Sequence, residues 1–439
     1  MPVYEAPAAP ARPPLLNDGV KRREVWAWAM YDFANSGYTT VVLTAVFNAY
    51  FVGVVAGNAD WATFAWTAAL GFSNALVMVL MPALGAYADL RAAKKRLLVL
   101  ATIGCVGGTA ALALAGPGDL WLAIVAVVLS NLFYAVGESL IAAFLPELAR
   151  RDAMGTVSGW GWSFGYFGGM LTLGLSLAWV LSAQARGEKA QDFVPVTMLI
   201  TAAVYLLAAL PTFALLRERA QPQAVQAAGL RASLVRLLHT WHEARQRRDF
   251  AWLLACCASY QAGITVVIAL AAVYAEQVLG FKQSETMLLI FLVNVASAIG
   301  AFAFGYWQDR LGHRRSLSLA LLGWIVMVAL AYLATSAPLF WLAAVIAGLC
   351  MGSTQSAGRA MAGLLAPADR RAEFFALWTF AVRLAAVVGP MTYGVVSWMT
   401  AGNHRLAILT TALFFVGGLV LLRPIDMARG IRAAGLQSK

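Results

Sequence analysis

Charged residues are scarce in this sequence of 439 residues, and long stretches lack them altogether. Asp, Glu, Lys and Arg make up 12% of the chain, and segments 61–88 and 250–275 contain none of them. An ordinary soluble domain carries about 25% charged residues, and a membrane β-barrel would show alternating segments of roughly ten residues. Because only a helix satisfies its own backbone over such apolar lengths, the sequence predicts a helical membrane protein with many spans.

Motifs for ATP hydrolysis, metal binding and catalysis are also missing. The sequence has no Gly-x-x-x-x-Gly-Lys-Ser/Thr loop and no recognisable Ser/His/Asp arrangement. His239 and His242 lie three residues apart without a third ligand nearby, and the four cysteines lie in apolar stretches. We therefore expect no enzyme activity, no cofactor, no metal site, and reduced, buried cysteines.

The positive charge is distributed unevenly along the chain. The net charge is +11, and 26 of the 32 Lys and Arg residues fall on one set of loops and termini, 4 on the other set and 2 within spans. This asymmetry predicts that both termini and the central segment 217–249 are cytoplasmic, so no nucleic-acid partner is needed to explain the charge. The central segment holds seven arginines, and residues 230–241 have the spacing of an amphipathic helix on the inner leaflet.

Twelve apolar segments fit the run lengths, six in each half of the chain. We expect them at about 25–52, 62–88, 97–116, 119–144, 154–182, 194–216, 250–279, 284–308, 314–335, 338–363, 372–400 and 404–423. The predicted organisation is a disordered cytoplasmic tail (1–24), an N-terminal six-helix bundle (25–216), a basic linker (217–249), a C-terminal six-helix bundle (250–423) and a cytoplasmic tail (424–439).

The two halves repeat one pattern. Matching residues recur at an offset of 220 or 221: Gly85 and Gly305, Asp89 and Asp309, Asn74 and Asn294, Pro146 and Pro367. Agreement in constant order at separate places predicts structural duplicates related by an axis along the membrane normal.

The charged loop at 305–315 carries a resemblance to a known family. Its pattern Gly-x-x-x-Asp-Arg-x-Gly-x-Arg-Arg, after the second helix of a six-helix half, resembles the major facilitator superfamily of secondary transporters. That resemblance implies an all-α fold of two pseudo-symmetric bundles, and loops whose acid sits near the start of a helix from the other half. In the first-half loop, Leu90 stands after the acid and Arg91 is the basic residue. The implied gating residues are Gly85, Asp89, Arg91, Gly305, Asp309, Arg310, Gly312, Arg314 and Arg315; the alternative is a plain cytoplasmic turn.

A narrower resemblance rests on segments 26–38, 144–149, 165–169 and 355–359. Together they are similar to the bacterial relatives of the yeast vacuolar amino-acid effluxer linked to autophagy. This resemblance implies a multi-pass protein of the bacterial inner membrane that works as a monomer, and it suggests a substrate class without naming a molecule.

The first span carries one polar stripe. Asp32, Asn35, Ser36 and Thr39 follow the i, i+3, i+4, i+7 spacing of a single helix face. A carboxylate deep in a membrane costs about 2.5–3.5 kcal/mol, so we expect it to face a cavity or a partner. The alternative is simple capping or packing near the helix start.

The fourth span of each half gives the sharpest signal. Asn131, Tyr134 and Glu138 share one face, and the 221-residue offset maps the last two onto Gln355 and Arg359. The resemblance places these helices around a central cavity, so we expect Glu138 to confront Arg359 across it. Arg383, in the eleventh span, is a competing partner for Glu138. Such a pair is either a permanent ion pair that offsets burial or one that substrate or a proton breaks and remakes.

These observations predict a secondary transporter. We expect alternating access, a small polar substrate such as an amino acid or an organic anion, and coupling to protons. The expected partners are the substrate, protons and the lipid bilayer. Two alternatives stay open: efflux of amphipathic drugs or lipids, and a non-transporting membrane sensor.

Overall fold

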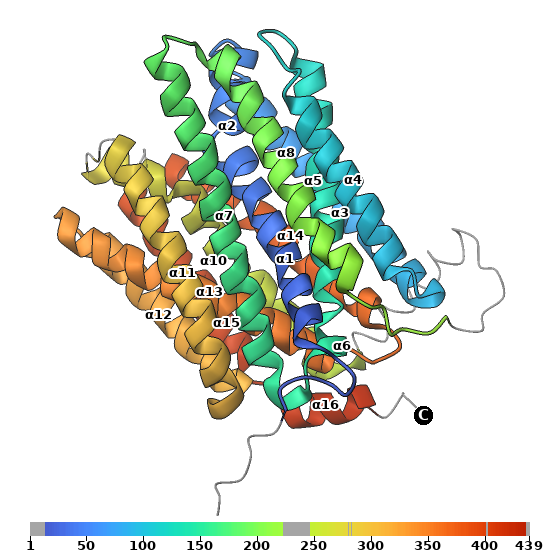
Figure 1. The fold of residues 1–439 in the computed structure, drawn as a ribbon. Coiled ribbons are helices and arrows are strands. Elements are labelled where there is room, and N and C mark those ends of the chain that lie inside the picture. Colours follow the sequence, from blue (N-terminus) through green and yellow to red (C-terminus); the bar gives the residue numbers. More distant parts are fainter. Residues whose placement is uncertain (1–13, 223–245, 280, 282, 401–402, 436–439) are drawn as a thin grey trace, which may run out of the picture.

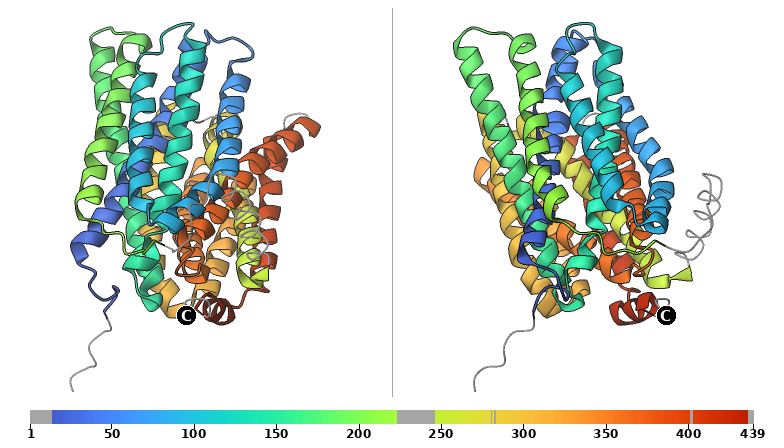
Figure 2. Two further views of the ribbon diagram at one scale, coloured as in Figure 1. Left: turned by 90° about the vertical axis from the view of Figure 1, so that its right-hand side faces the viewer. Right: turned by 45° about the vertical axis from the view of Figure 1, so that its right-hand side comes forward.

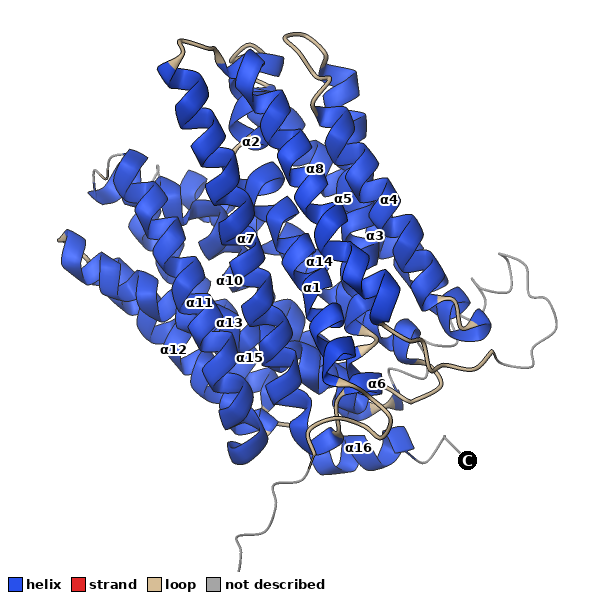
Figure 3. Cartoon of the chain, in the orientation of Figure 1, coloured by secondary structure: helices blue, strands red, loops and turns tan. Residues whose placement is uncertain are grey.

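A computed structural model describes residues 14–222, 246–279, 281, 283–400 and 403–435, and this part of the chain is built of helices joined by short loops (Figure 3). Twelve of its helical segments are long and apolar enough to cross a membrane, as predicted. The amphipathic helix expected at 230–241 and both histidines of that segment lie outside the described residues.

The N-terminal half contains six membrane spans. The first is α1 (Arg22–Tyr38), η1 (Thr39–Ala45), α2 (Phe47–Tyr50) and η2 (Phe51–Val55); the others are α3 (Ala62–Arg91), α4 (Lys94–Leu112), α5 (Leu120–Ala142) with the short α6 (Leu145–Leu148), η3 (Arg151–Ala153) with α7 (Met154–Ala185), and α8 (Ala190–Leu215).

The C-terminal half repeats the arrangement. Its spans are α10 (Arg248–Leu279), α11 (Gln283–Leu311), α12 (His313–Leu333), α13 (Ala337–Leu365), α14 (Arg371–Met399) and α15 (His404–Leu422), followed by a short helix, α16 (Met427–Gly435). The predicted span boundaries agree with these to within a few residues, because the ends of apolar runs mark where helices leave the membrane.

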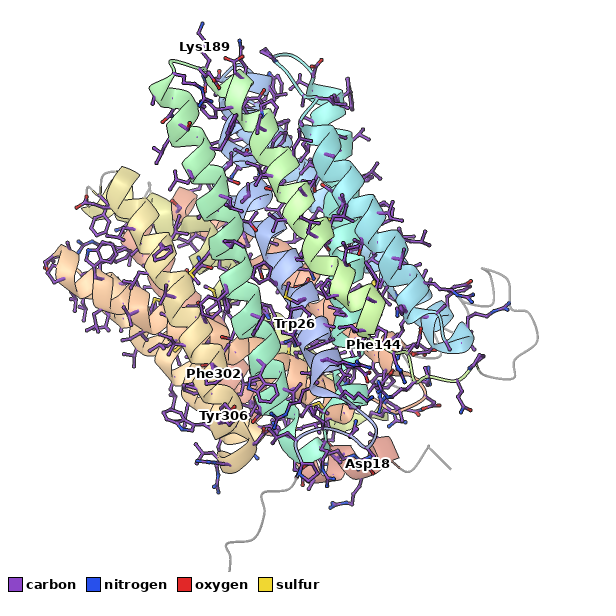
Figure 4. The ribbon with its side chains drawn as sticks, in the orientation of Figure 1. Asp18, Trp26, Phe144, Lys189, Phe302 and Tyr306 are labelled. Carbon is purple, nitrogen blue, oxygen red and sulfur yellow. The ribbon has the colours of Figure 1, made fainter. Side chains whose placement is uncertain are left out.

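Figures 1 and 2 show the two halves side by side, with α16 across one end of the bundle. α7 of the first half packs against α11 of the second, and α14 of the second packs against α3 of the first. These two pairs exchange under the predicted repeat. Figure 4 shows Asp18 at the same end of the bundle as α16, called the α16 end, and Lys189 at the opposite end, called the Lys189 end.

The first span is less regular than the sequence predicts. Thr39–Ala45 and Phe51–Val55 are π-helical, and Val46 between them departs from helical geometry at φ −115°. The Thr40 hydroxyl donates to the Ser36 carbonyl and the Thr44 hydroxyl to the Thr39 carbonyl. Such side-chain bonds compete with the regular backbone ladder in the first of these segments.

Both expected tails contain ordered structure. Residues 14–21 lie against the end of α6: the Asn17 backbone N–H donates to the Leu148 carbonyl at 2.9 Å, and the Arg150 N–H to the Leu15 carbonyl at 3.1 Å. Disorder was therefore the wrong prediction for these residues, because backbone pairing and the packing of Leu16 and Val20 against the core hold them in place. Near the other terminus, Arg429 of α16 binds the Asp249 carboxylate at 2.6 Å.

Candidate functional site

Two layers of polar contacts join the halves near the α16 end, and they contain six predicted charged residues: Asp32, Asp89, Glu138, Asp309, Arg359 and Arg383. The outer layer lies at the helix ends. The inner layer lies deeper: Arg359 is six residues before the end of α13 and Arg383 is twelve residues after the start of α14. At 1.5 Å per residue these depths are about 9 Å and 18 Å.

In the outer layer, Asp309 at the end of α11 binds the start of α7. Its carboxylate oxygens accept the Gly155 N–H at 2.8 Å and the Thr156 N–H at 2.7 Å. These first-turn N–H groups have no partner within their own helix, and the helix dipole favours an anion there. Gly305 permits the approach, because a Cβ atom would lie 2.8 Å from the Gly155 carbonyl oxygen.

Asp89 makes the equivalent contact in the other direction. Its carboxylate accepts the Glu373 N–H, in the first turn of α14, at 2.9 Å. A Cβ atom on Gly85 would lie 2.6 Å from the Ala372 carbonyl oxygen, so a side chain at this position would separate α3 from α14. The two acids at equivalent repeat positions thus cap helices of opposite halves. Their role in gating stays a prediction.

Sequence reasoning missed a third outer contact, centred on Glu147. This buried side chain is 2% exposed, pairs with Lys94 of its own half and lies 3.9 Å from the Arg371 guanidinium of the other half. Its second oxygen accepts the Arg219 backbone N–H at 3.1 Å. The signal was present in the sequence, since segment 144–149 places an acid directly after a proline at the end of the fourth span.

The inner layer contains two ion pairs that cross between the halves. In the first, Arg359 donates to Asp32 at 2.6 Å, with side chains 3% and 11% exposed. Arg359 also donates to the Ser158 carbonyl at 2.8 Å and to the Ser158 hydroxyl at 3.2 Å. The guanidinium lies 4.7 Å from the centre of the Trp28 ring and 5.3 Å from that of Trp162. Arg359 is therefore held by hydrogen bonds, an anion and two aromatic faces.

The absence of a side chain at Gly161 makes room for this pair. A Cβ atom there would lie 2.5 Å from an Asp32 carboxylate oxygen and 2.6 Å from an Arg359 nitrogen. The glycine thus lets α7 approach the charged groups directly.

The second pair joins Arg383 of α14 to Glu138 of α5, at 2.5 Å. The Glu138 side chain is 24% exposed, and the Arg383 guanidinium lies 5.5 Å from the Tyr134 ring centre. The Arg383 Nε is buried and has no hydrogen-bond partner within the described part of the chain. Unlike Arg359, this arginine has a donor to spare.

The expected confrontation of Glu138 with Arg359 was wrong. The repeat offset identifies equivalent positions in the two halves, but contact depends on which helices face each other. α5 faces α14, and α13 faces α7, so each fourth-span charge meets the fifth span of the opposite half. Glu138 finds Arg383 there. Arg359 finds Ser158 and Trp162, and takes its anion from Asp32.

The other predicted polar residues divide between the interface and the bundle interiors. Gln355 accepts a hydrogen bond from Gln261 at 2.7 Å, within the second half. Asn35 accepts from the Tyr205 hydroxyl at 2.6 Å, and Asn131 donates to Ser73 at 3.0 Å. Both asparagines are buried inside the N-terminal bundle and serve its packing, so the predicted stripe does not lie on one functional face.

Three further predicted residues, Ser36, Thr39 and Tyr134, lie next to these contacts. Ser36 lies beside Gly165 of α7, where a Cβ atom would be 2.9 Å from its hydroxyl oxygen. The Thr39 hydroxyl donates to the Ser36 carbonyl at 3.1 Å, at the start of the π-helical turns. Tyr134 stacks on Tyr38 with ring centres 5.2 Å apart, which places it between the N-terminal core and Arg383.

Of the predicted loop residues, Gly312 has a positive φ of 90°, which favours glycine. Arg91, Arg310, Arg314 and Arg315 are exposed. The four cysteines are free and buried, as expected. Within the described residues, no three His, Cys, Asp or Glu side chains are grouped to hold a metal ion.

Twelve spans in two duplicated bundles, joined by acids that cap helices of the opposite half, define a class of membrane protein. The fold is that of solved major facilitator transporters. The human organic anion transporter MFSD10 (TETRAN) superposes with a TM-score of 0.71 at 16% identity, over 91% of this chain and 99% of that one. The proton:xylose symporter XylE gives 0.71 at 14% identity, over 92% and 95%. A bacterial homologue of the iron transporter ferroportin, in an outward-facing state, gives 0.68 at 16% identity, over 92% and 99%.

Sequence comparison places the chain more narrowly. The family described as "Vacuole effluxer Atg22 like" matches residues 48–435, and the chain belongs to that family. The uncharacterized MFS-type transporter YxiO of Bacillus subtilis (strain 168) is 27% identical over 90% of this chain and 93% of its own length. Autophagy-related protein 22-1 of Aspergillus niger is 28% identical over 44% of this chain, which corresponds to 34% of that protein. The chain is thus a membrane transporter of the major facilitator type.

Proposed function

We propose that this transporter moves a small polar metabolite carrying a carboxylate, either an amino acid or an organic anion, by alternating access, and that it couples the movement of an organic anion to protons. The observation that carries the proposal is the Glu138–Arg383 pair. It crosses between the halves, it is partly exposed, and Arg383 retains a buried Nε–H without a partner in the described structure.

Arg383 supplies the chemistry for a carboxylate. A guanidinium binds a carboxylate in a planar, two-bond geometry, and its free Nε–H is one of the donors that this geometry uses. A substrate carboxylate arriving at Arg383 would take the place of Glu138. Because the substrate and Glu138 compete for one cation, occupancy of the site changes the charge balance of a contact between the halves.

The two substrate classes differ in what Glu138 then requires. The ammonium group of an amino acid would pair with the released Glu138, so no proton is needed. An organic anion leaves Glu138 without a cation, so the site carries one excess negative charge that a proton would balance. An anion would therefore cross together with a proton.

The contact pattern also supports alternating access. The contacts between the halves that involve Asp89, Asp309, Glu147 and the two inner pairs all lie toward the α16 end. At the Lys189 end the helix ends of the two halves lie apart in both Figures 1 and 2. We assign the α16 end to the cytoplasm of a bacterial inner membrane from the positive charge on its loops, which makes this an outward-facing state.

A thermal-stability screen tests the substrate class. Purified protein is heated with amino acids, organic acids, nucleosides, sugars and amphipathic cations in turn. A ligand that binds the folded state raises the melting temperature. At a concentration of a hundred times its Kd, the ligand stabilises the folded state by about 2.7 kcal/mol. We expect only carboxylate-bearing compounds to act, and only when Arg383 is present. Stabilisation by amphipathic cations, equal in an Arg383→Gln variant, would favour efflux of amphipathic compounds instead.

A further inference from the structure

A surface cleft of about 930 Å³ lies at the α16 end, outside the seam between the halves. The turn between α11 and α12 forms one wall, and the link from α15 to α16 forms the other; the lining residues are 311–315, 318–319 and 425–428. α12 lies at the outer edge of the bundle in Figure 1. Since α12 is a membrane span that begins at His313, the cleft lies where the bilayer surface meets the protein.

The charge of this cleft is positive. Arg314 and Arg315 are exposed, and no ion pair is recorded for either within the described residues. α12 starts after Gly312, which has no side chain to cap the free N–H groups of the first turn. The acid in the lining, Asp426, already accepts the Arg429 N–H at 3.0 Å, where it caps α16. The cleft therefore holds two cations and an uncapped helix start against one carboxylate, which already caps α16. This balance of charge favours the binding of an anion.

The apolar rim decides between a soluble anion and a lipid. Leu311 and Leu319 line the cleft and are 45% and 50% exposed. Trp307 and Leu322 on the same two helices are 51% and 49% exposed. A free phosphate gains nothing from such a surface, whereas acyl chains lie along it while the headgroup binds the cations.

We propose that this cleft binds the phosphate headgroup of an anionic phospholipid. The lipid contacts Arg314, Arg315 and the start of α12 through its phosphate, and the outer face of α11 and α12 through its acyl chains. It joins α12 to the α16 link, close to the contact of Asp309 with α7. The proposal stands independently of the transported substrate.

Native mass spectrometry of the full-length protein tests the proposal. Protein released from detergent is titrated with phosphatidylglycerol, with phosphatidylcholine of the same chains, and with inorganic phosphate. The test variant is Arg314→Ala/Arg315→Ala. Its matched control is Arg22→Ala/Arg23→Ala, which removes two exposed charges at the same end of the other half. A third variant, Ser318→Glu, keeps both arginines and adds an acid to the cleft lining.

We expect one phosphatidylglycerol to bind the wild type and the control equally. Each interfacial arginine contributes about a factor of five, so the test variant should bind about 30-fold more weakly. Ser318→Glu should also weaken binding. Equal binding by wild type and test variant, or an equal loss in the control, would overturn the proposal. So would binding of phosphatidylcholine as tight as that of phosphatidylglycerol, or saturable binding of inorganic phosphate that excludes the lipid. Elution of each variant as a monodisperse peak shows that it is folded.

Discussion

The two membrane arginines, Arg359 and Arg383, are held very differently. Arg359 binds Asp32 and both the carbonyl and hydroxyl of Ser158, next to two tryptophan rings. Arg383 binds Glu138 at the side of one tyrosine ring and keeps a buried Nε–H without a described partner. A buried arginine whose three nitrogens all have partners stabilises one arrangement of the halves, whereas one with a nitrogen left without a partner can accept another anion. We therefore propose that Arg359 serves closure and that Arg383 serves substrate recognition.

The largest effect on stability should follow from removing Asp32, the anion that pairs with Arg359. Asp32→Ala leaves Arg359 charged and without its counter-ion inside the membrane, which we expect to lower the free energy of unfolding by about 3–5 kcal/mol. Glu138→Ala should cost less, because Glu138 is 24% exposed and water can replace its role. Unfolding of the purified variants, titrated with denaturing detergent and followed by tryptophan fluorescence, measures both. A larger loss in Glu138→Ala would reverse the assignment of the two pairs.

Substrate affinity should depend on Arg383. Arg383→Ala removes a charge-assisted contact to the carboxylate, so we expect the Kd of the strongest ligand from the screen to rise about 100-fold, equivalent to about 2.7 kcal/mol. Isothermal titration of detergent-purified protein gives this value. Arg383→Lys keeps the charge but loses the planar geometry and should recover only part of the affinity. Full affinity in Arg383→Ala would place recognition elsewhere.

A smaller effect on stability should come from adding one methyl group beside the Asp32–Arg359 pair. The Cβ of Gly161→Ala would lie 2.5 Å from an Asp32 oxygen, so α7 must shift and we expect a loss of about 1–3 kcal/mol of stability. Gly174→Ala on the same helix is the matched control, since nothing lies within 4 Å of its Cβ. Detergent-denaturation midpoints compare the two. Equal midpoints would show that Gly161 does not make room for the pair.

The smallest expected effect concerns the outer layer. Asp309→Asn weakens an anion at a helix start, which is worth about 0.3–1 kcal/mol. We expect a modest shift toward states that are open at the α16 end. Spin labels on cysteines introduced at Arg151 and Arg310, both exposed, report the distance between the halves, because the four natural cysteines are buried. An unchanged distance distribution in Asp309→Asn and Asp89→Asn alike would argue against a gating role.

The fold was predictable from the sequence because each physical requirement leaves a local mark. Spans show as apolar runs, and duplication shows as the offset between Asp89 and Asp309. The π-helical turns at Thr39–Ala45 were not predictable, since they depend on which threonine hydroxyls bind the backbone.

The site was predictable in its members more than in its pairing. Asp32, Glu138, Arg359 and Arg383 were found because an ionised residue inside a membrane span is rare. The expected pairing of Glu138 with Arg359 was wrong and Glu138 pairs with the competing partner, Arg383, because contact between helices depends on rotation about each axis, which the spacing within one helix does not reveal. The Asn131 side chain shows the same limit. It shares a helix face pattern with Glu138 yet binds Ser73 inside one bundle.

Uptake into proteoliposomes, measured with and without an imposed pH gradient, tests the central claim that the solute takes the place of Glu138 at Arg383. For an organic anion, we predict that the wild type accumulates it only when the pH gradient is present, and that Glu138→Gln still exchanges it across the membrane but no longer concentrates it. Accumulation that ignores the gradient and is unchanged in Glu138→Gln would contradict proton coupling through this pair.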